Sequence, residues 1–167
     1  MIKKTFSAAV AGIVLCGLSI SALAGDEPLS VSVKRLSLDS AARIAQATIE
    51  ECRNQGYQVS VTVVDRNGIP QVMHRDSLAP PVSIGISKDK AYTAANFMSP
   101  SGALKRLEGS PLFNRDGLAM MEGGLLIEAG GQVYGAVGVS GAPGGDIDAS
   151  CAKAGIASVV EDLEMDG

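Results

Sequence analysis

The stretch VYGAVGVSGAPGGDIDASCAKAGI, residues 133–156, decides the fold because it joins an apolar segment to a helical one through a glycine-rich bend. Small and apolar residues that alternate over residues 132–140 predict a strand, and apolar positions recur at helical spacing after the bend. Glycine inside a strand indicates that another group approaches its backbone closely. The bend leaves two alternatives, a phosphate-binding loop or a tight corner in a small fold.

The bend lacks the signatures of a phosphate loop. Neither G-x-G-x-x-G nor G-K-[ST] can be drawn through its glycines. Asp146 and Asp148 stand where the following helix begins, and carboxylates there complement the helix dipole themselves and repel phosphate. We therefore predict the tight corner.

The rest of the chain predicts further helices and a second hairpin. In the first hairpin the turn is Asp65-Arg66-Asn67-Gly68, and Asn-Gly is among the strongest short hairpin signals. The predicted elements are a helix from Ser37–Asp39 to Gly56, strands over 59–64 and 69–74, a helix over 83–97, a short helix to Arg106, an irregular loop over 107–118, strands over 125–128 and 132–140, and a helix over 147–164. This order predicts an α+β fold, an antiparallel sheet of two hairpins flanked by helices.

The N-terminal residues are typical of an export signal. Lys3 and Lys4 precede an apolar run over residues 8–20, which ends in Ala22-Leu23-Ala24. The run is too short to favour a stable membrane span. We predict a cleaved signal peptide over 1–24, a single domain over 25–167, and a periplasmic or secreted protein. A lipid anchor on Cys16 and an uncleaved N-terminal anchor are the alternatives.

Composition and cysteine content narrow the function classes. The net charge is −4, the sequence contains no Trp, and it has three each of Tyr and Phe, so neither a basic stripe nor a stacking platform for nucleic acid is present. Removal of the signal peptide would leave Cys52 and Cys151. An oxidising compartment permits a disulfide between them, and two buried thiols are the alternative. With no Cys-x-x-Cys pattern, a zinc site is disfavoured.

Three blocks of the sequence resemble one known family. They are QVSVTVVDRNGIPQVMHRD at 58–76, DKAYTAANF at 89–97 and VGVSGAPGGDIDASCAKAGI at 137–156. The blocks look like the GlcG/HbpS-type haem-binding family, which also supplies the C-terminal domain of PduO-type proteins. The resemblance implies a profilin-like fold and homo-oligomers from dimer to octamer. It also implies binding of haem or iron. Many members carry a histidine after the loop proline, where this chain has Pro81-Val82.

His74 is the single histidine and the first candidate for an axial ligand of haem iron, a metal-binding role that imidazole commonly fills. Arg75 beside it could pair with a haem propionate. The alternative is a solvent-facing histidine at a strand end, with Arg75 and Asp76 as a surface ion pair. Other candidate iron donors are Met73, Met98, Met120, Met121, Tyr92 and Tyr134.

The helix over 83–97 carries two more candidate binding residues. Its helical spacing predicts one shared face for Ile84, Lys88, Ala91, Tyr92 and Ala95. Lys90 and Tyr92 could line a small pocket for the cofactor. The alternative is ordinary helix packing with a solvated lysine at position 90.

These observations lead to three hypotheses about function. The first is an exported small-ligand-binding protein that takes haem or another tetrapyrrole for sensing, storage or transport, with no membrane insertion after cleavage. The second is an accessory or partner-binding subunit without haem. The third, a small-molecule enzyme, is less favoured, because the chain has one histidine and no G-x-S-x-G elbow.

Overall fold

The computed structural model of the protein describes residues 28–166. The predicted signal peptide and Cys16 lie outside these residues. Internal contacts divide the chain after Val31, and the second unit, Ser32–Gly167, holds all the helices and strands discussed below. Within residues 28–166, no helix is both long enough and apolar enough to cross a membrane.

The elements follow the predicted order. They are α1 (Leu38–Asn54), β1 (Ser60–Asp65), β2 (Pro70–Arg75), α2 (Val82–Phe97), η1 (Ser101–Leu107), η2 (Pro111–Asn114), β3 (Gly124–Ala129), β4 (Gln132–Ser140) and α3 (Gly145–Met165). The Ser37 hydroxyl caps α1 by accepting a hydrogen bond from the backbone N–H of Ser40. The stretch predicted as a short helix and an irregular loop contains two 3₁₀ helices, η1 and η2.

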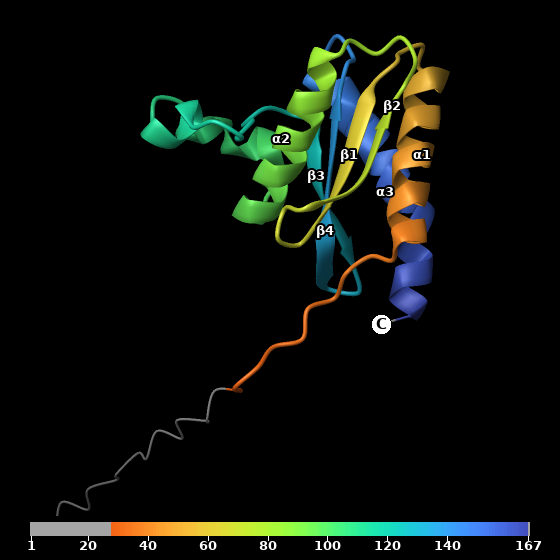
Figure 1. Ribbon diagram of the computed structural model, residues 1–167, viewed down its shortest axis with the longest axis vertical. Coiled ribbons are helices and arrows are strands. Elements are labelled where there is room, and N and C mark those ends of the chain that lie inside the picture. The colour runs from red at the N-terminus through yellow and green to blue at the C-terminus, as the bar shows by residue number, and fades with distance from the viewer. Residues whose placement is uncertain (1–27, 167) are drawn as a thin grey trace, which may run out of the picture. The chain divides into compact units, whose positions relative to one another are not determined.

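The four strands form one antiparallel sheet in the order β2-β1-β4-β3 (Figure 1). Each hairpin pairs its own strands, and the inner strands β1 and β4 join the two hairpins. In the first turn, the Asp65 carboxylate accepts hydrogen bonds from the backbone N–H groups of Asn67 and Ile69. Gly68 has a φ of 80°, a left-handed conformation that favours glycine. The predicted α+β fold with two hairpins is confirmed.

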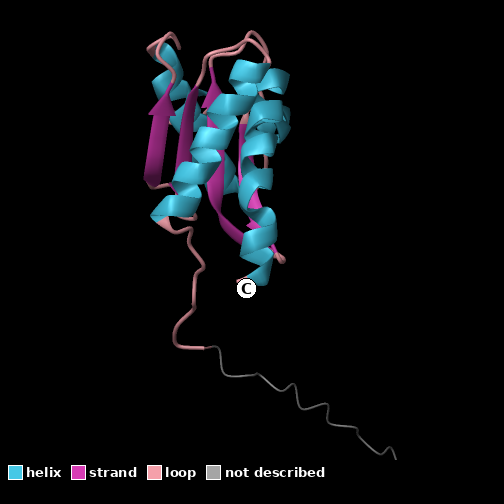
Figure 2. Cartoon of the chain, turned by 90° about the vertical axis from the view of Figure 1, so that its right-hand side faces the viewer, coloured by secondary structure: helices cyan, strands magenta, loops and turns pink. Residues whose placement is uncertain are grey.

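Helices cover both faces of the sheet. The helices α1 and α3 pack side by side on one face (Figure 2), and α2 packs on the other, over β1 and β4 (Figure 1). The disulfide between Cys52 and Cys151 joins α1 to α3, with a Cα–Cα distance of 5.4 Å. Of the two alternatives for these cysteines, the structure therefore forms the cross-link. A methyl group at Gly155 of α3 would overlap the Thr48 hydroxyl of α1, so these two helices approach closely.

The face under α2 is built from small and hydroxylated residues. The hydroxyls of Ser60 and Ser83 lie 2.8 Å apart, and those of Thr62 and Ser87 lie 2.9 Å apart, so each pair joins β1 to α2. A methyl group at Gly138 would overlap the backbone oxygen of Ser87. The glycine in β4 therefore admits the helix backbone, as the sequence indicated.

The predicted buried face of α2 is wrong. The sequence grouped Ile84, Lys88, Ala91, Tyr92 and Ala95, but Lys88 and Tyr92 are exposed. The buried positions of the helix are Ser83, Ser87, Lys90, Ala91, Thr93, Ala94 and Ala95. The prediction followed the spacing of the apolar residues. It failed because α2 packs on the sheet through small and polar side chains.

Candidate functional site

A cavity of about 610 Å³ lies between α2, the η1–η2 stretch and the corner that joins β4 to α3. We call it the Lys90 pocket. Its lining residues are Ile86, Lys90, Gly102, Lys105, Glu108, Phe113, Leu118, Ala119, Met120, Met121, Glu122, Ser140, Ala142, Gly145 and Asp148. Small-molecule sites commonly have volumes of roughly 300–1,000 Å³, so this cavity has the size of a ligand pocket.

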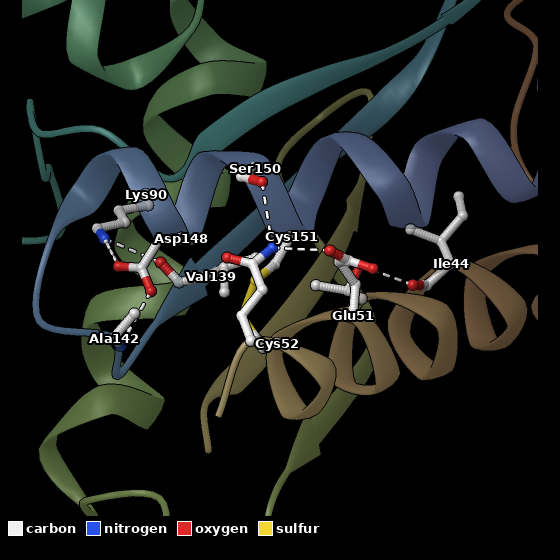
Figure 3. Close-up of a disulfide and its surroundings, with 11 residues drawn as sticks. Ile44, Glu51, Cys52, Lys90, Val139, Ala142, Asp148, Ser150 and Cys151 are labelled. Carbon is white, nitrogen blue, oxygen red and sulfur yellow. Dashed lines mark hydrogen bonds and ion pairs between the residues drawn. A yellow bond between two sulfur atoms is a disulfide. The ribbon is translucent and has the colours of Figure 1, made fainter. Parts of the chain in front are cut away.

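A buried ion pair between Lys90 and Asp148 forms part of the pocket lining. Lys90 comes from the middle of α2 and Asp148 from the first turn of α3, and their side chains are only 3% and 4% exposed. The Lys90 Nζ donates hydrogen bonds to Asp148 Oδ2 at 2.8 Å and to the Val139 carbonyl oxygen at 2.9 Å (Figure 3). Asp148 Oδ1 accepts from the backbone N–H of Ala142 at 3.1 Å. One carboxylate therefore links α2, α3 and the corner after β4.

The surroundings of this pair shape its electrostatics. Burial raises the pKa of Asp148 above its usual value, and the hydrogen bond and positive charge of Lys90 oppose that increase. Both side chains are almost inaccessible to solvent, so each charge is stabilised by the other and by a backbone hydrogen bond. Removing one partner would leave an uncompensated buried charge, which is strongly destabilising.

The pocket combines an apolar wall with a charged rim. Ile86, Phe113, Leu118 and Met120 supply the larger apolar side chains, and Met120 is only 5% exposed. The charged rim residues Lys105, Glu108 and Glu122 are exposed. The arrangement suits a molecule with an apolar body and a polar group that reaches the buried pair.

Of the two residues predicted on α2, one lines this pocket. Lys90 does so, but it is buried and paired, so the alternative of a solvated lysine is wrong. Tyr92 is not among the lining residues. Its ring lies against Gly68 in the β1–β2 turn, and its side chain is partly exposed.

His74 lies in a different place, on β2. It is half-buried and lines a second cavity of about 280 Å³, which we call the His74 pocket. The other lining residues are Gln46, Ile49, Arg53, Met73, Arg75 and Asp76. This volume lies just below the range common for small-molecule sites.

The charged residues around His74 pair differently from the predicted alternative. Asp76 does not pair with Arg75. It accepts two hydrogen bonds from Arg53, at 2.6 Å from Nε and 2.9 Å from a terminal nitrogen. These bonds lower the pKa of Asp76 and raise that of Arg53. Arg75 donates from Nε to the Ala79 carbonyl oxygen at 2.9 Å.

The structure therefore does not gather the four predicted binding residues into one site. His74 pairs in register with Val61, which belongs to the core under α1 and α3, whereas Lys90 and Tyr92 lie on α2. Among residues 28–166, no group of three or more histidine, cysteine, aspartate or glutamate side chains could hold a metal ion. Asp148, which the sequence assigned only to the helix dipole, is the residue that completes the Lys90 site.

The sequence model described as "Haem degrading protein HbpS-like" matches residues 36–157, which include both sides of the Lys90–Asp148 pair. The chain belongs to the HbpS-like family. The family predicted from the three sequence blocks is confirmed.

Solved and curated relatives agree with the HbpS-like assignment. The crystal structure of HbpS is 37% identical, with a TM-score of 0.72, and the match covers 77% of this chain and 93% of that one. The protein ORFY of Klebsiella pneumoniae is 28% identical, with a TM-score of 0.73 and coverage of 78% and 94%. Protein GlcG of Escherichia coli is 34% identical over 108 residues, which cover 63% of this chain and 81% of GlcG.

Proposed function

We propose that this protein binds haem or a closely related tetrapyrrole, and that the Lys90 pocket holds the macrocycle. Membership of a family described by haem degradation is the observation that carries the proposal. The Lys90 pocket has a volume of about 610 Å³, against about 280 Å³ for the His74 pocket. A tetrapyrrole macrocycle requires a cavity larger than the His74 pocket.

The residues of the Lys90 pocket fit this ligand. Phe113, Leu118 and Ile86 offer an apolar wall for a flat macrocycle, and the thioethers of Met120 and Met121 are candidate axial donors. Haem, when bound, supplies an iron centre for ligand or redox chemistry. The chain's own part is to exclude water from one side of the ring and to hold the polar edge.

His74 remains the competing iron ligand. Its imidazole is half-buried in the His74 pocket, between α1 and β2, and it would be the donor if the macrocycle lay at that pocket. Within one chain, the His74 pocket and the Lys90 pocket have no lining residue in common. The two possible haem sites therefore predict that different substitutions will change haem binding.

A titration with haemin tests both. The purified protein should shift and sharpen the Soret band at one equivalent per chain. Met120→Leu and Met121→Leu should change the band if the iron lies in the Lys90 pocket, whereas His74→Ala should leave it unchanged. A His74→Ala protein that loses the band would move the site to β2. A wild-type protein with no Soret shift would end the haem proposal.

We further propose that the protein is exported and acts in haem sensing, storage or transport. The signal-like pattern of residues 1–24 supports export. Mass spectrometry of protein recovered from a periplasmic extract would check it, and the expected N-terminus is Gly25. A chain retained whole in the cytoplasm would contradict this part of the proposal.

We also propose a homo-oligomer, as the resemblance implied. Apolar side chains stand exposed near the β2 side of α2, at Ile69, Met73, Val82 and Tyr92, with exposed fractions from 37% to 68%. Light scattering during gel filtration should give a mass of at least two chains. A monomer, or a stable complex with another protein and no haem, would favour the accessory-subunit hypothesis.

A further inference from the structure

Lys90 is buried, which is unusual for a lysine side chain. The residue is 2% exposed, yet it lines the Lys90 pocket. Lysine is almost never fully buried unless it is paired, and Asp148 supplies the pair. The ammonium group is therefore a fixed feature of the cavity rather than a solvated side chain that happens to lie near it.

The Lys90 ammonium can donate one more hydrogen bond. It carries three N–H bonds, and the hydrogen bonds within residues 28–166 use two of them, to Asp148 and to Val139. Gly123 lies against the same nitrogen, because a methyl group there would stand only 2.8 Å from Nζ. Since Lys90 also lines the pocket, an acceptor oxygen of a molecule held there would approach the third N–H from the pocket.

The charges nearby narrow the kind of acceptor. Asp148 balances Lys90, and the exposed Glu108 and Glu122 at the rim outnumber Lys105. These carboxylates repel a compact polyanion such as phosphate more strongly than a ligand that presents one carboxylate to Lys90 and keeps its other charges away from the rim. A single carboxylate that reaches the ammonium would gain a charge-assisted hydrogen bond in a site shielded from water.

We propose that Lys90 anchors one carboxylate of a ligand whose apolar body lies against Phe113, Leu118 and Met120. The Lys90 pocket would thus select apolar carboxylates, and Asp148 would act as a positioning residue that fixes the ammonium. The inference rests on the proposed function, because a tetrapyrrole propionate is such a carboxylate. It extends that function to a ligand class that does not require iron.

The test compares acids with their uncharged counterparts on the whole protein. Protoporphyrin IX and its dimethyl ester, followed by fluorescence, form one pair of probes. The second pair is 4-phenylbutyrate and 4-phenylbutanol, followed by amide chemical shifts. In each pair the wild-type protein should bind the acid about tenfold to a hundredfold more tightly, the range expected for one charge-assisted hydrogen bond.

Removing Lys90 alone would leave Asp148 buried without a partner, so the variant replaces both. Lys90→Met with Asp148→Leu removes both charges together, so that neither is left buried without a partner. It should bind the uncharged probes as the wild type does and lose the preference for acids. Lys88→Met with Asp146→Leu is the matched control, because both side chains are exposed on the same two helices. It should keep the preference.

Two results would overturn the inference. One is equal affinity of the wild-type protein for the acid and the uncharged probe of each pair, and the other is an acid preference that survives in the Lys90→Met, Asp148→Leu protein. If neither porphyrin binds, the haem proposal fails, and the phenylbutyrate pair alone decides the role of Lys90.

Discussion

The two faces of the sheet are built from different residues. Towards α1 and α3, β1 and β4 present valines, at Val61, Val63, Val137 and Val139, all of them fully buried. Towards α2, the same two strands present Ser60, Thr62, Val64, Ala136 and Gly138, and hydroxyl pairs and close backbone contact replace large apolar side chains. The first face maximises apolar burial, which is the dominant favourable contribution to folding. The second holds a helix close to the sheet and leaves a pocket at one end.

The ion pairs near the two pockets differ as well. Lys90 and Asp148 are both nearly inaccessible, whereas Arg53 in its pair with Asp76 is 52% exposed. An exposed partner is screened by water and salt, so a pair of that kind contributes little to stability. We therefore expect the stability of the α2 face, which has fewer large apolar side chains, to depend more on its ion pair than the stability of the α1–α3 face does.

Asp148→Ala is the most direct test of the dependence on the buried ion pair. It strands the Lys90 ammonium and removes the acceptor of the Ala142 N–H, so we expect unfolding free energy to fall by about 3–5 kcal/mol. Urea denaturation followed by circular dichroism measures the loss. Asp146→Ala removes an exposed carboxylate of the same first turn and should cost less than about 1 kcal/mol, the contribution of a charge to the helix dipole. Equal losses in the two proteins would show that the buried pair contributes no special stability.

Removing the disulfide tests the valine face. Cys52→Ala with Cys151→Ala opens a cross-link with a sequence separation of 99, and cross-links of this kind contribute about 2–4 kcal/mol. The urea midpoint should fall accordingly, and the reduced wild-type protein should fall with it. Binding in the Lys90 pocket should persist below the midpoint. Loss of binding without loss of fold would mean that the two faces are coupled more tightly than their separate cores indicate.

A pair of glycine substitutions compares the close contacts on the two faces. Gly138→Ala sets a methyl group against the Ser87 backbone oxygen, and overpacking of this kind costs about 1–3 kcal/mol. Gly155→Ala meets the Thr48 hydroxyl, which can turn away only by giving up its hydrogen bond to the Ile44 carbonyl oxygen, and the methyl would also lie 2.8 Å from that oxygen. The added alanine returns about 1 kcal/mol of helix propensity, and the backbone contact at Gly138 is closer than the one at Gly155. Thermal unfolding should therefore rank Gly138→Ala as the more destabilising change. The reverse order would place the tighter contact between α1 and α3.

Acid sensitivity gives the smallest expected effect. Arg53 lowers the pKa of Asp76 below its usual 3.8, so the folded state favours the charged carboxylate. That contribution is fully present above the unfolded value and is lost as pH falls through the lowered folded value. Asp76→Asn should therefore lower stability at pH 7, and the difference from the wild type should narrow as the pH falls below 3.8. Urea unfolding at pH 7 and at a series of lower pH values checks this. A difference that stays constant across the series would point to packing rather than charge.

The hairpins were predictable because local chemistry specifies them. Asn67-Gly68 sets the first turn, and β-branched residues mark β1. The Lys90 pair was not predictable in the same way, because its partners are 58 positions apart and tertiary packing brings them together. A signal was nevertheless present. Ser83, Ser87, Lys90 and Ala94 recur at helical spacing, and a search for small residues rather than apolar ones would have found the buried face.

For His74, the sequence could identify the residue but not its surroundings. The sequence identified the residue correctly as the single imidazole, but the pleat of β2 decided its surroundings. With Arg75 next to it on the strand, the two side chains leave the backbone on opposite sides. No pattern within the strand could show that Arg53, from α1, would take Asp76 as its partner.

Both long-range links described above end in the first two turns of α3, at Asp148 and Cys151. On the ribosome, α3 emerges after the other helices and strands of residues 28–166. A nascent chain would already contain Lys90 and Cys52 while their counterparts are still unmade. The Lys90 pocket is therefore completed only once α3 has been made, so a nascent chain that stops short of Asp148 would lack the buried ion pair.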